Sequence, residues 1–205
     1  QQTTSEHWHA YTDGGASSKH ATKHTIAGWG FCAKRAQQTG TWVRAHGRVT
    51  VDDRHAAYLG SQVGSNNTAE ITAIAELLMW ALQALPDQSA LKIHFDSKIA
   101  SHTIRGIWKA KTNKRLVRTV RALLRAASGK FKIAWQWVKG HSGNEGNEEA
   151  DRLASEGQKY ARPSGGRFNQ PGSAWMFAIS KLEDGPDLDP PISDLNTAND
   201  DFTNA

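Results

Sequence analysis

The chain has 205 residues, a formal net charge of +5 and a single cysteine. This length suffices for one buried domain with an appended segment, and the lone Cys32 excludes an internal disulfide. No apolar run approaches the roughly 20 residues that span a bilayer, and QQTTSEHWHA lacks a signal peptide's apolar stretch, so we expect an intracellular protein of the cytoplasm or nucleus.

The first part of the chain has the alternating pattern of a sheet. Residues 8–12 (WHAYT) alternate and end at Asp13-Gly14-Gly15, which predicts a strand followed by a turn whose glycines let the backbone pass close to a site. Residues 26–34 and 41–51 are typical of the next two strands of an antiparallel meander. No element is assigned to residues 52–64.

Helical spacing begins after this segment. From 68 to 85 apolar residues recur at helical spacing, with Pro86 just beyond the end, and Glu70 is placed in the first turn. Residues 90–95 form a short apolar strand that delivers Asp96. A helical piece is expected to start at Ser97.

The remaining elements follow the same alternation of helix and strand. Val117, Val120 and Leu124 mark a helix, 132–138 a strand and 148–159 a last helix. The order βββαβαβα predicts an α/β fold with a mixed sheet flanked by helices.

The composition changes near residue 160. Residues 161–205 hold three Lys/Arg and seven Asp/Glu, a net charge of −4, which leaves +9 for residues 1–160. Five of the six prolines also follow residue 160. We therefore predict a basic domain over 1–160 and an acidic, proline-containing C-terminal tail over 161–205 that is poorly ordered. Its segment 174–182 (AWMFAISKL) is apolar enough to bind this domain or a neighbouring one; the alternative is an incidental apolar patch.

Four acidic residues lie in widely separated segments that suit catalytic carboxylates: Asp13 in YTDGG, Glu70 in NNTAE, Asp96 in HFDS and Asp151 in EEADRLA. A carboxylate that ends a strand stands at the rim of the sheet, and Glu70 and Asp151 open amphipathic runs that can point across at that rim. Clustered carboxylates raise one another's pKa unless cations neutralise them, and an oxygen-rich site favours Mg²⁺ or Mn²⁺. As alternatives, Asp13 is only a turn former and Asp96 only a helix N-cap. The alternative for Glu70 is a first-turn carboxylate favoured by the helix dipole, and the alternative for Asp151 is a charge that merely solvates the last helix.

The segment WVKGHSGNEGNEEADRLASEG places His141 ten residues before Asp151. With this segment the chain strongly resembles type 1 ribonuclease H, whose pattern is TDG, an N-x-x-x-E helix start, DS after a strand, and GH[SA]G followed by NE.AD.LA. The resemblance covers residues 6–160, and the matching residues are Thr12-Asp13-Gly14, Asn66 to Glu70, Asp96-Ser97 and Gly140 to Ala154. A single DG or DS pair is common, but all these elements in order are hard to obtain by chance.

This resemblance implies a ribonuclease H-like five-stranded sheet, with three antiparallel strands and then parallel strands. It implies an endonuclease that hydrolyses the RNA strand of RNA/DNA hybrids with two Mg²⁺ ions about 4 Å apart, which Mn²⁺ can replace, and leaves 5′-phosphate and 3′-hydroxyl ends. In the family pattern Asp13 bridges both metals and Asp96 holds the ion on the nucleophile side. Glu70 and Asp151 complete the shells. His141 is expected to relay protons, although a glycine-flanked histidine in a loop is often simply exposed.

The resemblance also suggests nucleic-acid contacts. Asn66 and Asn67 match positions that the family uses in the minor groove, with plain capping residues as the alternative. Ser65 and Asn113 match positions that grip a DNA phosphate, and Trp108 is expected to stack on the DNA strand or to cover the core. The predicted contact set is Gly14, Ser65, Asn66, Asn67, Trp108, Asn113, Lys114 and Arg118.

The chain departs from the best-known cellular members between Ile99 and Leu116, where the family often inserts a basic, Trp-rich helix and loop. Here it offers only RGIWKAKTNKR. We expect basic residues to substitute, because Arg118, Arg121 and Arg125 can share one helical face; solvated charges are the alternative. Short versions of this region occur in domains that lean on a larger partner such as a reverse transcriptase.

This departure suggests a module of a retroelement polyprotein, with a free-standing cellular enzyme as the rival. In isolation we expect a monomer. Two functional alternatives remain open at this point: a binding or scaffold domain that keeps the fold without the activity, and a related nuclease that acts on other duplexes.

Overall fold

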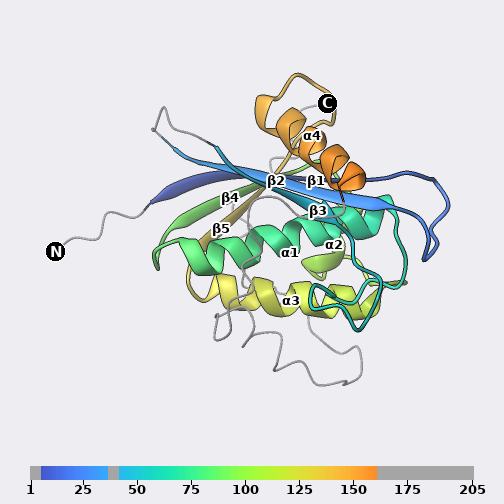
Figure 1. Ribbon diagram of the computed structural model, residues 1–205. Helices are drawn as coiled ribbons and strands as arrows, with labels where there is room; N and C mark the ends of the chain where they lie inside the picture. Colours follow the sequence, from blue (N-terminus) through green and yellow to red (C-terminus); the bar gives the residue numbers. More distant parts are fainter. Residues whose placement is uncertain (1–5, 37–41, 161–205) are drawn as a thin grey trace.

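The computed structural model describes residues 6–36 and 42–160, which form a five-stranded mixed sheet with helices on both faces (Figure 1). The strands are β1 (His7–Ala16), β2 (Ala27–Arg35), β3 (Val43–Arg48), β4 (Ala90–Phe95) and β5 (Lys132–Trp137). The helices are α1 (Asn66–Ala84), α2 (Lys98–Ile104), α3 (Lys114–Ser128) and α4 (Glu145–Lys159). The predicted tail over 161–205, with its apolar segment 174–182, lies outside the described residues.

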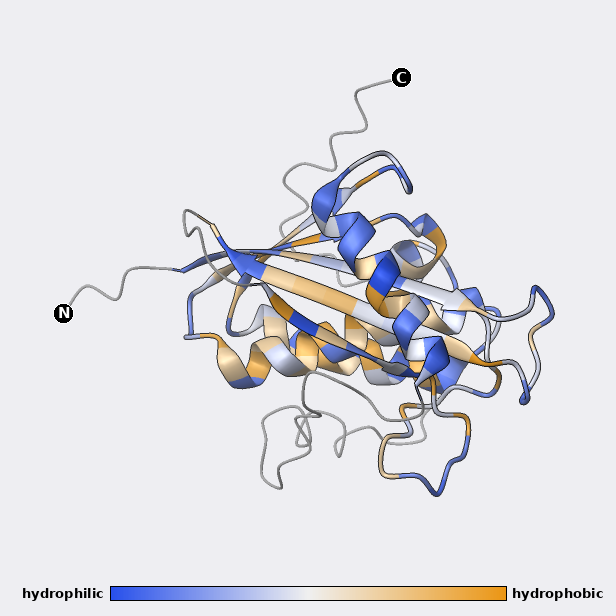
Figure 2. Ribbon diagram, turned by 45° about the horizontal axis from the view of Figure 1, so that its top comes forward, coloured by the Kyte–Doolittle hydropathy of each residue, from blue (hydrophilic) through white to orange (hydrophobic). Residues whose placement is uncertain are grey.

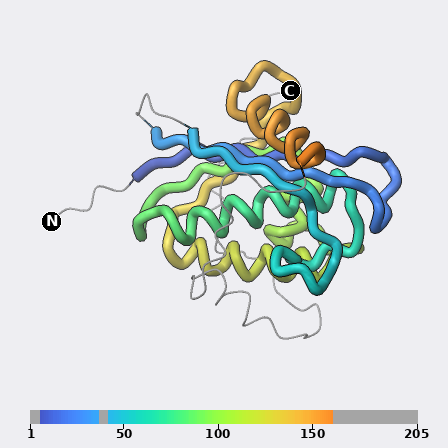
Figure 3. Tube along the Cα trace, viewed as in Figure 1, coloured from blue at the N-terminus to red at the C-terminus, as the bar shows by residue number. Residues whose placement is uncertain are grey.

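The sheet has the order β3-β2-β1-β4-β5, so that β1 lies at its centre. β1, β2 and β3 pair antiparallel, whereas β4 runs parallel to β1 and β5 runs parallel to β4. In the sequence α1 follows β3 and precedes β4, and the Cα trace shows how this helix carries the chain back across the sheet (Figure 3). The predicted arrangement of three antiparallel strands followed by parallel strands is therefore confirmed.

The helices divide between the two faces of this sheet. α1, α2 and α3 lie on one face and α4 on the other (Figure 1). Between β4 and β5 the structure has two helices, α2 and α3, which confirms both the helical piece expected from Ser97 and the helix marked by Val117, Val120 and Leu124; the order βββαβαβα counted only one of them. α2 begins at Lys98 because the Ser97 side chain accepts a hydrogen bond from the backbone N–H of Ala100 and so caps the helix.

The core is densest where α1 meets the sheet. This helix is buried almost all round because it lies between the strands and α3, and its fully buried Ile and Leu side chains each stabilise the fold by about 1.5–3 kcal/mol. Trp80 packs edge-on against Trp8 of β1, with ring centroids 5.3 Å apart. Figure 2 shows hydrophobic residues gathered along α1, whereas α4 is largely hydrophilic.

Three sequence predictions on element boundaries are wrong, and each concerns a site residue. β1 continues past Asp13 to Ala16, because Gly14 and Gly15 pair with β2 instead of turning. α1 begins at Asn66, so Glu70 lies beyond its first turn. α4 begins at Glu145, so Asp151 lies near the middle of that helix.

Polar caps explain the early starts of α1 and α4. The Ser65 side chain accepts from the backbone N–H of Thr68, and the Thr68 hydroxyl accepts from the backbone N–H of Ser65, which forms a reciprocal capping box. Asn144 caps α4 by accepting from the backbone N–H of Asn147 at 3.1 Å. These caps lie before the apolar positions, so the helical periodicity alone did not reveal them.

Candidate active site

Strand register places two of the predicted carboxylates side by side. β1 and β4 are parallel neighbours in which Thr12 pairs with Phe95. In each chain segment the residue that follows this pair is an aspartate: Asp13 on β1 and Asp96 just beyond β4. Because the pairing of β1 with β4 ends at this point, both carboxylates lie beside the carboxyl end of β4, where ligands bind in open α/β layers.

Glu70 reaches this edge because Gly14 lets α1 approach the sheet. A Cβ atom on Gly14 would lie 2.2 Å from the backbone nitrogen of Glu70 and 2.7 Å from the Cβ of Ala69. No side chain fits in that space. The glycine that follows Asp13 in the sequence therefore determines how closely the Glu70 carboxylate can approach it.

Together Asp13, Glu70 and Asp96 form an acidic cluster in which one carboxylate oxygen of each lies within 4.8 Å of the others. Burial, followed by the charge of Asp96, raises the pKa of Asp13 from 3.8 to about 7. Burial and the charge of Asp13 raise the pKa of Glu70 well above its usual value, and burial also raises the pKa of Asp96. The three groups thus repel one another when ionised.

The acidic cluster has the chemistry of a site for a hard cation. The Asp96 Oδ1 atom is buried and has no hydrogen-bond partner, while Asp13 Oδ1 accepts the backbone N–H of Gly14, at 2.6 Å. A buried carboxylate oxygen without a partner is costly unless a cation or water satisfies it. Three carboxylates with no nitrogen or sulfur ligand favour Mg²⁺ or Mn²⁺ over softer metals.

Asp151 lies beside the acidic cluster rather than within it. Its charge contributes to the raised pKa of Asp13, Glu70 and Asp96, after the larger effects of burial and closer groups. The Asp151 Oδ2 atom is 3.8 Å from the Nδ1 atom of His141. Both side chains reach solvent, with 46% and 82% of their surface exposed, so this edge of the site is open.

A glycine-rich segment brings His141 to the site. His141 has a left-handed backbone, with φ of 52°, and Gly140 packs so closely on Asp96 that its Cβ would lie 3.0 Å from Oδ2. The predicted proton-relay residue therefore lies near Asp151, and it is close enough to Asp96 for its charge to act on that carboxyl.

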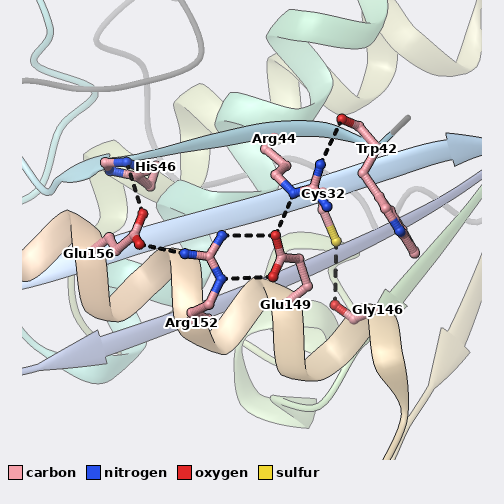
Figure 4. Close-up of polar contacts among 8 residues, drawn as sticks. All are labelled: Cys32, Trp42, Arg44, His46, Gly146, Glu149, Arg152 and Glu156. Carbon is pink, nitrogen blue, oxygen red and sulfur yellow. Dashed lines mark hydrogen bonds and ion pairs between the residues drawn. The ribbon is translucent and has the colours of Figure 1, made fainter. Parts of the chain in front are cut away.

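An ion-pair network holds α4, and with it Asp151, against the sheet (Figure 4). The Arg152 guanidinium donates to both oxygens of Glu149, at 2.8 and 2.9 Å, and also to Glu156. Glu149 in turn accepts from Arg44 of β3, and Glu156 lies 3.4 Å from His46 Nε2 on the same strand. The hydrogen bonds from Arg152 and Arg44 lower the pKa of Glu149 to about 2.

Glycines of β2 allow α4 to pack closely against the sheet. A Cβ on Gly30 would lie 2.5 Å from the backbone nitrogen of Ala154, so the helix backbone rests directly on the strand. Cys32, also on β2, is fully buried and donates its thiol to the Gly146 carbonyl at 3.4 Å. These contacts determine the position of the helix turn that carries Asp151.

The predicted nucleic-acid contacts fall into two groups. Asn67 and Trp108 line one groove beside the acidic cluster, and Asn66 is exposed next to them. Ser65 and Asn113 are instead engaged in local structure. Ser65 caps α1, and Asn113 is 6% exposed with its Oδ1 atom accepting from the backbone N–H of Gln62 at 3.3 Å.

The predicted basic face on α3 is partly wrong. Arg121 is only 7% exposed and donates to the carbonyl of Thr103 at 2.8 Å, so it packs between α2 and α3. Arg125 is exposed, and Arg118 is half-buried. A buried arginine such as Arg121 can be tolerated because the end of α2 supplies a carbonyl acceptor. The spacing of the arginines in the sequence did not reveal this neighbour.

Sequence analysis missed a pair of side chains beside Asp96. The indole N–H of Trp137 donates to the Asp96 carbonyl at 3.1 Å, and the Lys98 ammonium lies 4.4 Å from the Trp137 ring centroid. A cation over an aromatic face is favourable by about 0.5–1 kcal/mol at an exposed site. The signal was present in the sequence, since Trp137 is the last residue of β5, next to the strand that delivers Asp96.

None of the helices in the described part of the chain is long and apolar enough to cross a membrane.

Comparisons with known proteins show relatives over most of the described chain. The family model for RNase H matches residues 5–159. A ribonuclease H of Jannaschia sp. (strain CCS1) is 31% identical over 157 residues, which are 72% of this chain and 88% of that protein. A ribonuclease H of Herminiimonas arsenicoxydans is 34% identical over 120 residues, or 53% of this chain and 79% of the relative.

Solved structures share the fold at lower sequence identity. LC9-RNase H1, a type 1 RNase H with the type 2 active-site motif, has a TM-score of 0.58 at 18% identity, over 81% of this chain and 78% of that one. The N-terminal RNase H domain of a Mycobacterium tuberculosis protein has a TM-score of 0.56 at 21% identity, over 77% and 96%.

Proposed function

Because the chain belongs to the ribonuclease H family, we propose that it hydrolyses the RNA strand of RNA/DNA hybrids with divalent metal ions, Mg²⁺ or Mn²⁺, at the acidic cluster. The proposal includes a two-metal arrangement, with products that carry 5′-phosphate and 3′-hydroxyl ends. The observation that carries it is the convergence of Asp13, Glu70 and Asp96 from three separate elements within 4.8 Å. The three carboxylates repel one another when ionised, and this repulsion would destabilise the fold without benefit if no cation were bound.

In this proposal the carboxylates hold the metal ions, and the chain supplies no covalent nucleophile. Asp13 is proposed as the ligand that both ions share, and its Oδ2 atom is not used by the hydrogen bond from Gly14. When bound, divalent ions lower the pKa of the attacking water and stabilise the leaving 3′ oxygen. Asp151 completes the site from α4, whose position the ion-pair network with β3 maintains.

His141 is proposed to move protons at the open edge of the site. Its imidazole Nδ1 lies 3.8 Å from the Asp151 carboxylate, which can orient the ring. The exposed position lets the ring exchange protons with water. A histidine is suited to this task because its ordinary pKa lies close to neutral pH.

Selection of the RNA strand is proposed to rest on the start of α1. Asn67 has a buried Oδ1 atom without a hydrogen-bond partner, and Asn66 is exposed beside it. Amide groups in this position can exchange hydrogen bonds with ribose 2′-hydroxyls in the wide minor groove of an A-form-like hybrid. Ser65 and Asn113 hold this loop region together, and their contact with a DNA phosphate remains a prediction.

A second candidate is a domain that binds a partner through the same fold without cleaving nucleic acid. The short connection between α2 and α3, residues 105–113, favours this possibility, because a domain without its own basic extension depends on additional contacts elsewhere. The same observation keeps the retroelement-module hypothesis as a prediction.

The test is a substrate panel in which each strand is labelled separately: RNA/DNA hybrid, duplex DNA, duplex RNA and single strands, in Mg²⁺ and in Mn²⁺. The expected result is cleavage of the RNA strand of the hybrid alone, with fragments that a 5′-phosphate-dependent exonuclease degrades. Fragments with 5′-hydroxyl ends would contradict the proposed water attack. Binding of the hybrid without cleavage of any substrate would support the non-catalytic domain.

A further inference from the structure

An apolar groove lies beside the acidic cluster, between the start of α1, helix α2 and the loop that leads to α3. Its volume is about 700 Å³. The apolar residues that line it are Ile71, Ile99, Ile107, Trp108, Ala110 and Val117. None of them is one of the proposed metal-binding carboxylates, but the lining also includes Asn67, which is proposed to contact the hybrid.

The groove exposes large side chains that a protein normally covers. Ile99, Ile107 and Trp108 are 60%, 49% and 45% exposed, and they are half of the strongly exposed large apolar residues in the part of the chain that the structure describes. Scattered exposed apolar residues are ordinary, but a gathered set of them marks an interaction surface. The groove is therefore a candidate binding surface.

The lining favours a peptide over a nucleic acid. Five of the six apolar lining residues are aliphatic, and the sixth, Trp108, already has its ring 4.7 Å from the ring of His102, measured between centroids. A nucleic-acid strand binds through phosphates and through stacking of its bases on aromatic faces, so aliphatic side chains offer it little. Apolar peptide side chains, in contrast, gain about 25 cal/mol per Å² of surface that they bury here.

We propose that residues 174–182 of the same chain, AWMFAISKL, dock in this groove. The segment supplies Trp175, Met176, Phe177 and Ile179 within five positions. Acidic residues follow it at once, and the groove is bordered by the exposed cations Lys109 and Lys111. The acidic residues are Glu183, Asp184, Asp187 and Asp189. The apolar side chains of the segment thus fit the apolar lining of the groove, and the acidic residues that follow it are opposite in charge to the two lysines at the border.

The chain is long enough for this contact. α4 ends at Lys159, and residues 161–173 can span up to about 45 Å. A domain of this size has a diameter of about 40 Å, so the segment can reach the groove from the end of α4. Docking within one chain also benefits from the high effective concentration that a short connection provides.

Docking has a regulatory consequence, which rests on the proposed function. Asn67 lines the groove together with Trp108, and both are proposed to contact the hybrid. A docked segment covers them, so the tail and the hybrid compete. If the tail is docked for about nine-tenths of the time, the hybrid binds about tenfold more weakly than it does to a chain whose tail cannot dock.

Hydrogen exchange of the full chain, measured without nucleic acid, tests the docking itself. The tail variant combines Trp175→Ser, Phe177→Ser and Ile179→Ser. Its matched control carries Ile192→Ser and Leu195→Ser, which change apolar tail residues outside the segment. The reciprocal groove variant carries Ile99→Ser and Ile107→Ser, two exposed positions whose replacement leaves the core intact.

The tail variant is expected to exchange about tenfold faster than wild type over residues 98–112, with no change in the control. The groove variant is expected to accelerate exchange over residues 174–182. Unchanged exchange in both variants would overturn the proposal. Protection that depends on protein concentration would assign the groove to a second copy, and protection that appears only with added hybrid would assign it to nucleic acid.

A separate titration with RNA/DNA hybrid tests the competition. The tail variant is expected to bind the hybrid about tenfold more tightly than wild type, while the control binds as wild type does. Equal affinities together with altered exchange would keep the docking and refute the competition. Altered exchange in a protein that cleaves no hybrid would refute the proposed function and leave the docking supported.

Discussion

Replacement of Asp13 by asparagine is expected to stabilise the metal-free protein while it abolishes cleavage. Asp13 is 6% exposed, and burial, followed by the charge of Asp96, raises the pKa of its carboxyl from 3.8 to about 7. Each unit by which the folded-state pKa exceeds the unfolded one corresponds to about 1.4 kcal/mol. Above about pH 7 the ionised Asp13 carboxylate therefore destabilises the fold by about 4 kcal/mol.

The sign of the effect determines its pH dependence. The folded-state pKa of Asp13 lies above the unfolded value, so the folded chain holds the proton more tightly. The destabilisation is absent well below pH 3.8, where the carboxyl is protonated in both states, and it grows until the pH exceeds about 7. The Asp13→Asn variant should gain about 4 kcal/mol at about pH 8 and about 2 kcal/mol at about pH 5.

Urea-induced unfolding in the presence of a chelator measures this gain directly. Wild type, Asp13→Asn and Asp53→Asn are compared at both pH values, since Asp53 is an exposed loop carboxylate away from the acidic cluster. The control should differ from wild type by less than about 0.5 kcal/mol. The reasoning fails if Asp13→Asn is no more stable than wild type at the higher pH, or if its gain is equal at both.

Three further predictions follow from the same geometry. Mg²⁺ at a hundred times its dissociation constant should stabilise wild type by about 2.7 kcal/mol and Asp13→Asn by much less, which thermal unfolding with and without the ion would show; equal shifts would place the metal elsewhere. Gly14→Ala should lower the free energy of unfolding by about 1–3 kcal/mol and abolish hybrid cleavage, because its Cβ would lie 2.2 Å from the Glu70 nitrogen. Gly129→Ala, whose Cβ meets nothing closer than 3.5 Å, is the matched control in both measurements. Glu149→Gln should lower stability by about 1 kcal/mol in low salt and by less in high salt, because it weakens the partly exposed network with Arg152; a salt-independent loss would contradict an electrostatic origin.

Most of the fold followed from local signals in the sequence. The alternation in 8–12, the strand-like run 26–34 and the helical spacing of 68–85 indicated the right elements, because their apolar residues are buried in the core. The boundaries near the site were less predictable. β1 runs on through Gly14 and Gly15 because pairing with β2 outweighs the turn preference of two glycines, and that pairing is a long-range contact.

The acidic cluster was predictable as a set of residues but not as a geometry. The motifs named Asp13, Glu70 and Asp96, and the structure brings them together. The place of Asp151 beside the cluster depends on where α4 rests on the glycines of β2 and on the ion pairs with β3. No local pattern around Asp151 reports those contacts.

The basic face on α3 was mispredicted for a related reason. Helical spacing places Arg118, Arg121 and Arg125 on one side of α3, but it does not say which part of that side meets a neighbour. α2 covers the middle position, and the Thr103 carbonyl at its end accepts from Arg121. The apolar groove was missed likewise, since Ile99, Ile107 and Val117 come from separate segments that only the tertiary structure unites.

The proposed cleavage of the RNA strand at the acidic cluster is tested by single-turnover cleavage of a strand-labelled RNA/DNA hybrid in Mg²⁺ by wild type and by Asp13→Asn, both shown to be folded by their unfolding curves. Wild type is expected to cut only the RNA strand, and the variant is expected to be slower by about a thousandfold or more, as for loss of a group that acts mainly in the transition state. Cleavage of the DNA strand, or a variant with near wild-type rate, would contradict the proposal.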